Sequence, residues 1–132
     1  MEIKHLHHFA FNTWKIKETL AFYQDIFGFQ VVSKIPLDGD VVYKLGMGKD
    51  FFIEPFDCSQ NPNKMQPSNC ETSILGITHI GFDVEDIEQY SKLLEKHQVE
   101  FTVKLKRLED FNCRVLFFKD PNGIEIELFE ED

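Results

Sequence analysis

The sequence predicts an α+β fold made of two tandem βαβββ modules, and three observations support this prediction. The segment HFAFNT (residues 8–13) has a counterpart, HIGFDV (residues 79–84), 71 residues later. Both segments alternate apolar and polar residues as a half-buried strand does, and each precedes apolar residues at helical spacing. Each half then continues with three more runs typical of strands. We therefore interpret the chain as a duplicated unit.

The first module begins with the strand over residues 8–13, whose apolar face carries Phe9 and Phe11. A helix follows, because apolar residues recur at helical spacing before a glycine that suits a helix C-terminus. These residues are Ile16, Leu20, Tyr23, Phe27 and Gly28. Three more strands are expected, over residues 29–35, 41–48 and 51–56.

The second module repeats this order, starting with the strand over residues 79–84. Its helix is indicated by Ile87, Tyr90, Leu94 and His97, and Asp83 is the expected N-cap. Strands are then expected over residues 99–105, 114–119 and 124–129. The sequence DPNG (residues 120–123) predicts a hairpin turn between the last two strands.

We expect one domain over residues 1–132, with module one at 1–57, a linker at 57–73 and module two at 74–132. The linker is polar, contains Pro62 and Pro67, and has no periodicity. A βαβββ unit cannot cover both faces of its own sheet. We therefore expect the helices on the outer faces and the two sheets paired around a shared cleft.

Composition limits the classes of partner. With 23 acidic and 14 basic residues, the formal net charge is −9, which argues against nucleic acid and anionic membrane surfaces. No segment is apolar enough for a signal peptide or a membrane span. The three cysteines have no C-x-x-C spacing. We therefore expect a reduced, soluble, cytoplasmic protein that acts on a small molecule.

The strand faces opposite the helices carry the candidate site. His8 and His79 are equivalent in the repeat, and Glu54 precedes Glu127 by 73 residues, nearly the same offset. Each module thus contributes one His from its first strand and one Glu from its last strand. Imidazole and carboxylate donors suit a divalent transition metal, and burial of two carboxylates without a cation is costly. Four such ligands leave two positions of an octahedral ion open, as catalysis requires. The expected fold is therefore two sheets around a shared metal-binding cleft.

Three segments carry a resemblance to a known family. They are HHFAFNTWKIKETLAFYQDIFGF (residues 7–29), GITHIGFDVEDI (residues 76–87) and DPNGIEIELFE (residues 120–130). They resemble the vicinal oxygen chelate superfamily, which includes glyoxalase I, methylmalonyl-CoA epimerase, extradiol dioxygenases, fosfomycin-resistance enzymes and bleomycin-binding proteins. The resemblance covers nearly the whole chain. It implies metal ligands at His8, Glu54, His79 and Glu127, and a homodimer, which is usual in the superfamily.

The order His, Glu, His, Glu is similar to that of the glyoxalase I (lactoylglutathione lyase) branch. This likeness implies a lyase or isomerase that uses Ni, Zn, Co, Mn or Fe, with Glu127 or Glu54 moving a proton through an enediolate. Several alternatives stay open. The epimerase branch usually has glutamine at the position of Glu54, and extradiol dioxygenases would leave Glu54 unused. A binding protein that sequesters its ligand without catalysis is a further alternative, although bleomycin-binding members lack the metal ligands.

The remaining polar residues have less definite interpretations. Arg114 is a candidate for binding a substrate carboxylate from the cleft, and a surface position is the alternative. Glu125 is expected at the rim, near the turn. His7 is expected on the face of Phe9 and Phe11 by strand alternation. The sequence does not name the substrate, which could be a thiol adduct or another small oxygenated molecule.

Overall fold

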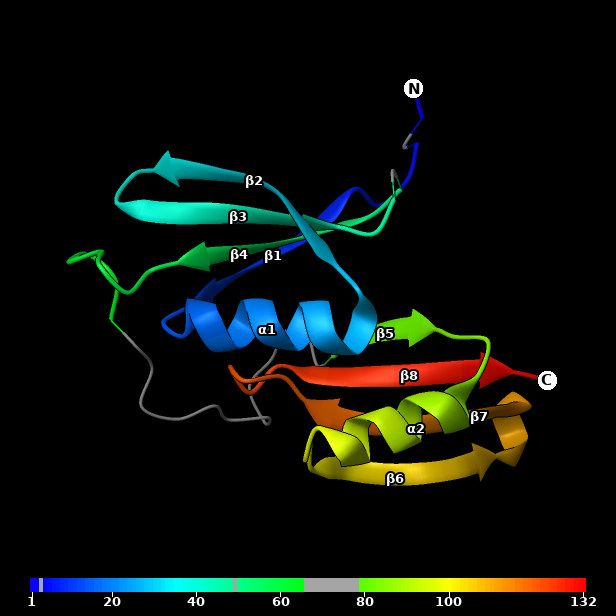
Figure 1. Ribbon diagram of the computed structural model, residues 1–132. Helices are drawn as coiled ribbons and strands as arrows, with labels where there is room; N and C mark the ends of the chain where they lie inside the picture. Colours follow the sequence, from blue (N-terminus) through cyan, green and yellow to red (C-terminus); the bar gives the residue numbers. More distant parts are fainter. Residues whose placement is uncertain (3, 49, 66–78) are drawn as a thin grey trace. The chain divides into compact units, whose positions relative to one another are not determined.

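The computed structural model describes residues 1–2, 4–48, 50–65 and 79–132 of the chain. It divides into two compact units, Met1–Ser68 and Asn69–Asp132. Within the described residues, each unit contains one α-helix and one four-stranded sheet. Figure 1 labels these elements. The predicted α+β class and the two βαβββ modules are confirmed.

Module one follows the predicted order of elements. They are β1 (His8–Thr13), α1 (Ile16–Phe27), β2 (Gln30–Leu37), β3 (Asp40–Gly46) and β4 (Phe52–Asp57). The sheet has the order β1-β4-β3-β2, in which β1 runs parallel to β4 and the other neighbours are antiparallel. The first and last strands of the module are therefore side by side.

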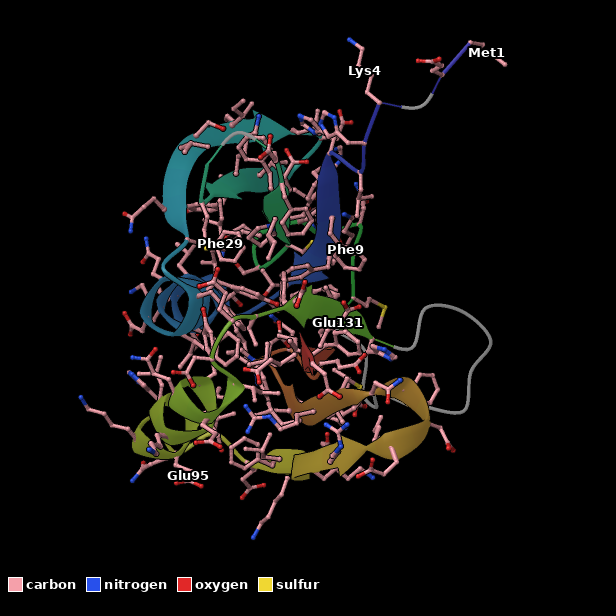
Figure 2. The ribbon with its side chains drawn as sticks, turned by 90° about the vertical axis from the view of Figure 1, so that its right-hand side faces the viewer. Met1, Lys4, Phe9, Phe29, Glu95 and Glu131 are labelled. Carbon is pink, nitrogen blue, oxygen red and sulfur yellow. The ribbon has the colours of Figure 1, made fainter. Side chains whose placement is uncertain are left out.

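Helix α1 covers one face of this sheet (Figure 1). Tyr23 of the helix is fully buried, and its ring centroid lies 6.0 Å from that of Phe11 on β1. The helix ends at Gly28, whose φ of 78° is left-handed, so that its N–H reaches back to the carbonyl of Gln24. Figure 2 shows Phe29, which is 1% exposed, directly after this turn. The predicted helix and its stop are both confirmed.

Module two has the same architecture. Its elements are β5 (Ile80–Asp83), α2 (Ile87–Lys96), β6 (Phe101–Leu108), a short 3-10 helix (Glu109–Phe111), β7 (Cys113–Lys119) and β8 (Glu125–Glu131). The sheet order is β5-β8-β7-β6, with β5 parallel to β8. On β8, Ile126 and Leu128 are fully buried, whereas Glu95 lies on the exposed side of α2 (Figure 2).

The turn between β7 and β8 is the predicted hairpin. The Asp120 carboxylate accepts hydrogen bonds from the backbone N–H groups of Asn122 and Ile124, both at 2.8 Å. Gly123 has a φ of 84°, which glycine adopts without strain. This turn sets the register in which Phe117 lies opposite Glu127.

The predicted N-cap of the second helix is wrong. Asp83 is the last residue of β5, and the helix begins only at Ile87. Asp86 is the N-cap, because its carboxylate accepts the backbone N–H of Gln89 at 3.0 Å. The β5 pairing instead continues beyond Asp83, where the N–H of Val84 donates to the carbonyl of Phe129.

The polar segment after β4 is partly described. Cys58 and Asn61 are buried, so this part of the predicted linker packs on module one. Residues 66–73 of the linker lie outside the described residues, as do residues 74–78 of the second repeat. In the described chain, neither helix is long and apolar enough to span a membrane.

We predict that Asp86→Ala lowers the free energy of unfolding by about 1 kcal/mol, because the first turn of α2 loses its cap. Urea unfolding of the full chain measures this change. Asp83→Ala is the matched control, since it removes a carboxylate of the same size three residues earlier. A loss at Asp83 equal to that at Asp86 would contradict the assignment.

Candidate functional site: two histidine–glutamate pairs

In module one, the parallel pairing of β1 with β4 brings His8 and Glu54 together. Ala10 lies opposite Glu54, and His8 lies one pleat away on the same face of β1. His8 Nε2 and Glu54 Oε2 are 3.1 Å apart. The Glu54 side chain is 20% exposed. A residue from each end of the module thus forms one contact.

Module two repeats this arrangement with the same register. Gly81 lies opposite Glu127, as Ala10 lies opposite Glu54. His79 Nε2 and Glu127 Oε2 are 2.9 Å apart. A Cβ atom at position 81 would lie 3.6 Å from Oε2 of Glu127. A small residue in this place therefore leaves room for the glutamate beside its histidine.

The structure also resolves which face Glu54 occupies. Its neighbours Ile53 and Pro55 are buried, whereas Glu54 points to the opposite side of β4. The sequence left this alternation ambiguous because FFIEPF has phenylalanine on both faces. The same division holds on β8, where Ile126 and Leu128 are buried and Glu127 lies between them on the other face.

Each pair has the chemistry of two metal ligands. Two ligand bonds of about 2.1 Å at a right angle hold their donor atoms about 3 Å apart. The separations of 3.1 Å and 2.9 Å match this value, and they also match ordinary hydrogen bonds. Across the residues that the structure describes, no group of three or more His, Cys, Asp or Glu side chains could hold a metal ion. Within the described residues, each histidine–glutamate pair therefore offers two metal-donor atoms, and no third His, Cys, Asp or Glu side chain joins it.

His7 contacts His8 rather than the face of Phe9 and Phe11, so its predicted position is wrong. The Nδ1 atoms of His7 and His8 are 2.9 Å apart, and the His7 ring lies 5.3 Å from that of Phe52. Strand alternation fails here because β1 begins only at His8. When His8 Nδ1 is the donor, its Nε2 keeps the lone pair that a metal ligand needs.

Arg114 lies on the helix-bearing side of its sheet. Its guanidinium donates to Glu130 and to Glu88, the latter at 2.8 Å in the first turn of α2. Arg114 pairs with Glu130 across the strands, whereas Phe117 pairs with Glu127 on the other face. The structure thus favours a structural ion pair for Arg114 over the alternative of substrate binding. Glu125 accepts from the Thr102 hydroxyl at 2.9 Å, at the end of β8 next to the turn.

Sequence reasoning did not single out Lys64. Its ammonium lies 2.6 Å from Asp40, which is 5% exposed, and 2.9 Å from the side-chain oxygen of Asn12. The hydrogen bond from Lys64 lowers the pKa of Asp40, and Asp40 in turn raises the pKa of Lys64. Burial raises the pKa of the neighbouring Cys58 thiol. The only signal in the sequence was the position of Asn12 in the HFAFNT repeat, which does not reveal a distant lysine.

Comparison with known proteins shows which family the chain belongs to. The model of the Glyoxalase/Bleomycin resistance protein/Dioxygenase superfamily matches residues 5–128. The chain belongs to this superfamily. The resemblance inferred from the sequence is therefore confirmed at the level of the superfamily, whose members include enzymes and binding proteins.

Several bacterial proteins match nearly the whole chain. The protein YaeR of Escherichia coli (strain K12) is 31% identical over 132 residues, which cover 98% of each chain. The crystal structure of a glyoxalase family protein from Enterococcus faecalis is also 31% identical, with a TM-score of 0.79, and covers 98% of this chain and 100% of that one. Lactoylglutathione lyase from Agrobacterium tumefaciens has a TM-score of 0.70 at 18% identity, covering 98% and 96% of the two chains. The last likeness concerns the fold alone.

The contacts of Glu130 predict a pH-dependent stability. Hydrogen bonds from Arg114 and from the backbone N–H of Ile87 lower the pKa of Glu130 below its ordinary value. The ionised form therefore stabilises the folded chain near neutral pH, and this contribution is lost as the pH falls through the lowered pKa. We expect Glu130→Gln to reduce the free energy of unfolding near neutrality, and we expect this reduction to shrink progressively as the pH falls below about 4.3, the ordinary pKa of glutamate.

Urea unfolding between neutral pH and about pH 3 tests this prediction. The control is Glu88→Gln, since Glu88 contacts the same arginine but its side chain is 58% exposed. A difference between wild type and Glu130→Gln that does not vary with pH would contradict the assignment.

Proposed function

We propose that the chain is a metal-dependent lyase or isomerase of the glyoxalase I type, which acts on a small substrate with oxygens on adjacent carbons. The proposed ligands of one divalent transition metal are His8, Glu54, His79 and Glu127. The observation that carries the proposal is the repetition of one histidine–glutamate contact at equivalent register positions of both modules.

The donor set supports this proposal over a binding protein without metal. Two imidazoles and two carboxylates suit Ni, Zn, Co, Mn or Fe, and the carboxylates balance the charge of a divalent ion. When bound, the ion would act as a Lewis acid toward negative charge on two adjacent substrate oxygens. The Glu54 carboxylate is four-fifths shielded and contacts His8, which is unlike a charge that merely faces solvent.

Glu127 is the preferred candidate for the catalytic base, with Glu54 as the second candidate. A base must move a proton between two adjacent carbons of the substrate, so its carboxylate needs room to reorient. Gly81 opposite Glu127 has no Cβ, whereas Ala10 opposite Glu54 has one. The chain's own contribution would then be proton removal and return by Glu127, beside His79. The proposal also includes a homodimer, as the resemblance implies.

The first prediction concerns metal binding. After removal of metal by a chelator, we expect the wild-type chain to bind one nickel, cobalt, zinc, manganese or ferrous ion per site. His8→Ala and His79→Ala should each weaken binding by more than about 100-fold, since even residues that only support a ligand contribute about 10- to 100-fold. Isothermal titration with each ion measures this affinity, and His97→Ala at the C-cap of α2 is the control.

Three other results would contradict the proposed ligands or favour a different function. Equal binding by wild type and both histidine variants would exclude these ligands. No binding of any ion would favour a protein that sequesters its ligand. Preference for ferrous iron together with oxygen uptake in the presence of a catechol would favour an extradiol dioxygenase.

The second prediction separates catalysis from metal binding. Glu127→Gln keeps an oxygen donor but removes the base, so we expect turnover to fall by at least about 100-fold while metal binding is largely retained. The assay follows conversion of vicinal-oxygen substrates, including thiol adducts of 2-oxoaldehydes, by the metal-loaded chain. Glu125→Gln is the matched control, because Glu125 lies two residues earlier on the same face of β8. Unchanged turnover in Glu127→Gln would exclude Glu127 as the base.

A further inference from the structure

We propose that module one binds a carboxylate group of the substrate in a small pocket beside His8 and Glu54, with Lys64 as the cation. This inference rests on the proposed function, because it assigns the pocket to the substrate of that site. It narrows the substrate to small molecules that carry a carboxylate as well as two adjacent oxygens.

The pocket opens on the face of the sheet that carries the histidine–glutamate pair. It has a volume of about 190 Å³ and is lined by Ala10, Phe11, Asn12, Phe56 and Lys64. Ala10 and Asn12 follow His8 at alternate positions of β1, and Phe56 follows Glu54 at the next alternate position of β4. Because drug-sized ligands occupy about 300–1,000 Å³, this pocket suits one end of a small molecule.

Lys64 is held in place at the edge of this pocket. Asp40 and the side-chain oxygen of Asn12 each accept a hydrogen bond from its ammonium, at 2.6 Å and 2.9 Å. A lysine ammonium has three N–H donors, of which Asp40 and Asn12 accept two. The Cys58 sulfur, a weak acceptor, also interacts with the ammonium. The buried carboxylate also keeps Lys64 protonated, since it raises the pKa of the ammonium. The side chain is 34% exposed, so a ligand can reach the ammonium and replace its weak contact with the Cys58 sulfur.

The NH₂ group of the Asn12 side chain is a second donor in the pocket. Its side-chain oxygen accepts from Lys64 and from the Cys58 thiol, at 2.9 Å and 3.3 Å. Lysine can only donate, which fixes the oxygen of the Asn12 amide toward it and turns the NH₂ group away. Asn12 is exposed, so this NH₂ group is available to a ligand. The polar side of the pocket therefore presents donors, which favours a carboxylate over a cation or an alcohol.

The other lining groups suit the carbon atoms next to that carboxylate. Ala10 and Phe56 are apolar, and the Lys64 ammonium lies 5.5 Å from the centroid of the Phe56 ring. In module two, the repeat places Asp83 at the position of Asn12. A carboxylate there would repel an anion. The duplicated modules thus present similar metal donors but different charges beside them, and only Asn12 suits an anionic end of the substrate.

The test uses benzoate as the probe and the metal-free full-length chain, so that its result does not depend on the metal. Benzamide is the neutral analogue of the same shape. Binding is measured by NMR titration, with the Asn12 side-chain amide and the Ala10 backbone amide as reporters. We expect benzoate to shift these signals and to bind at least about tenfold more tightly than benzamide.

The key variant is Asp40→Asn combined with Lys64→Met, since Lys64→Met alone would leave a buried unpaired carboxylate. We expect the double variant to bind benzoate at least about tenfold more weakly. Lys34→Met is the matched control, because Lys34 also lies over an aromatic ring, 5.4 Å from the centroid of Tyr43. It should bind benzoate as the wild type does.

The proposal is overturned if benzoate does not bind the wild type, if benzamide binds equally well, or if the double variant keeps its affinity. It is equally overturned if the shifted signals lie elsewhere than in this pocket. These outcomes are distinct from failure of the proposed function, which would appear as unchanged metal binding in the histidine variants. If benzoate binds as expected but the histidine variants bind metal as the wild type does, the pocket binds a carboxylate and the proposed metal ligands are wrong.

Discussion

The candidate site depends on one feature of each sheet, the parallel pairing of the module's first strand with its last. Residues 44–46 positions apart in the sequence, such as Ala10 and Glu54 or Gly81 and Glu127, lie opposite one another because of it. Parallel strands need a crossover connection, which α1 with β2 and β3 provides in module one. A shift of this register by one residue would turn Glu54 to the helix side, where an unpaired carboxylate is costly. The apolar side chains under the helices therefore fix the polar contacts on the opposite face.

Much of this arrangement could be predicted from the sequence because the chain is a duplication. An isolated histidine on an alternating strand carries little information, but His8 and His79 recur with similar neighbours, an apolar residue, a small residue and a phenylalanine. The repeat predicted the order of elements along the chain, both helices, and the contribution of one His and one Glu by each module. The helix stop at Gly28 and the turn at residues 120–123 could be predicted as well, since both rest on local backbone chemistry.

The features that the sequence did not reveal depend on contacts between distant residues or on the exact end of an element. The ammonium of Lys64 meets Asp40 and Asn12 across 24 and 52 positions of the chain, without any periodic pattern. His7 departs from alternation because it precedes β1. The cap at Asp86 depends on where α2 begins, which the periodicity of its apolar residues defines only within a turn. The contacts of Arg114 could not be predicted for the same reason, since its two partners, Glu130 and Glu88, lie on separate elements.

Duplication also allows the two modules to differ in the residues beside their histidine–glutamate pairs. The repeat preserves the histidine, the glutamate and a small residue opposite the glutamate, which together set the histidine–glutamate contact in each module. Positions one pleat further along are free to change, and here Asn12 corresponds to Asp83. The carboxamide lets Lys64 share its oxygen, whereas a second carboxylate would add to the charge of Asp40 nearby. Sequence change after duplication can therefore alter the charge beside one pair without disturbing the histidine–glutamate contact of either module.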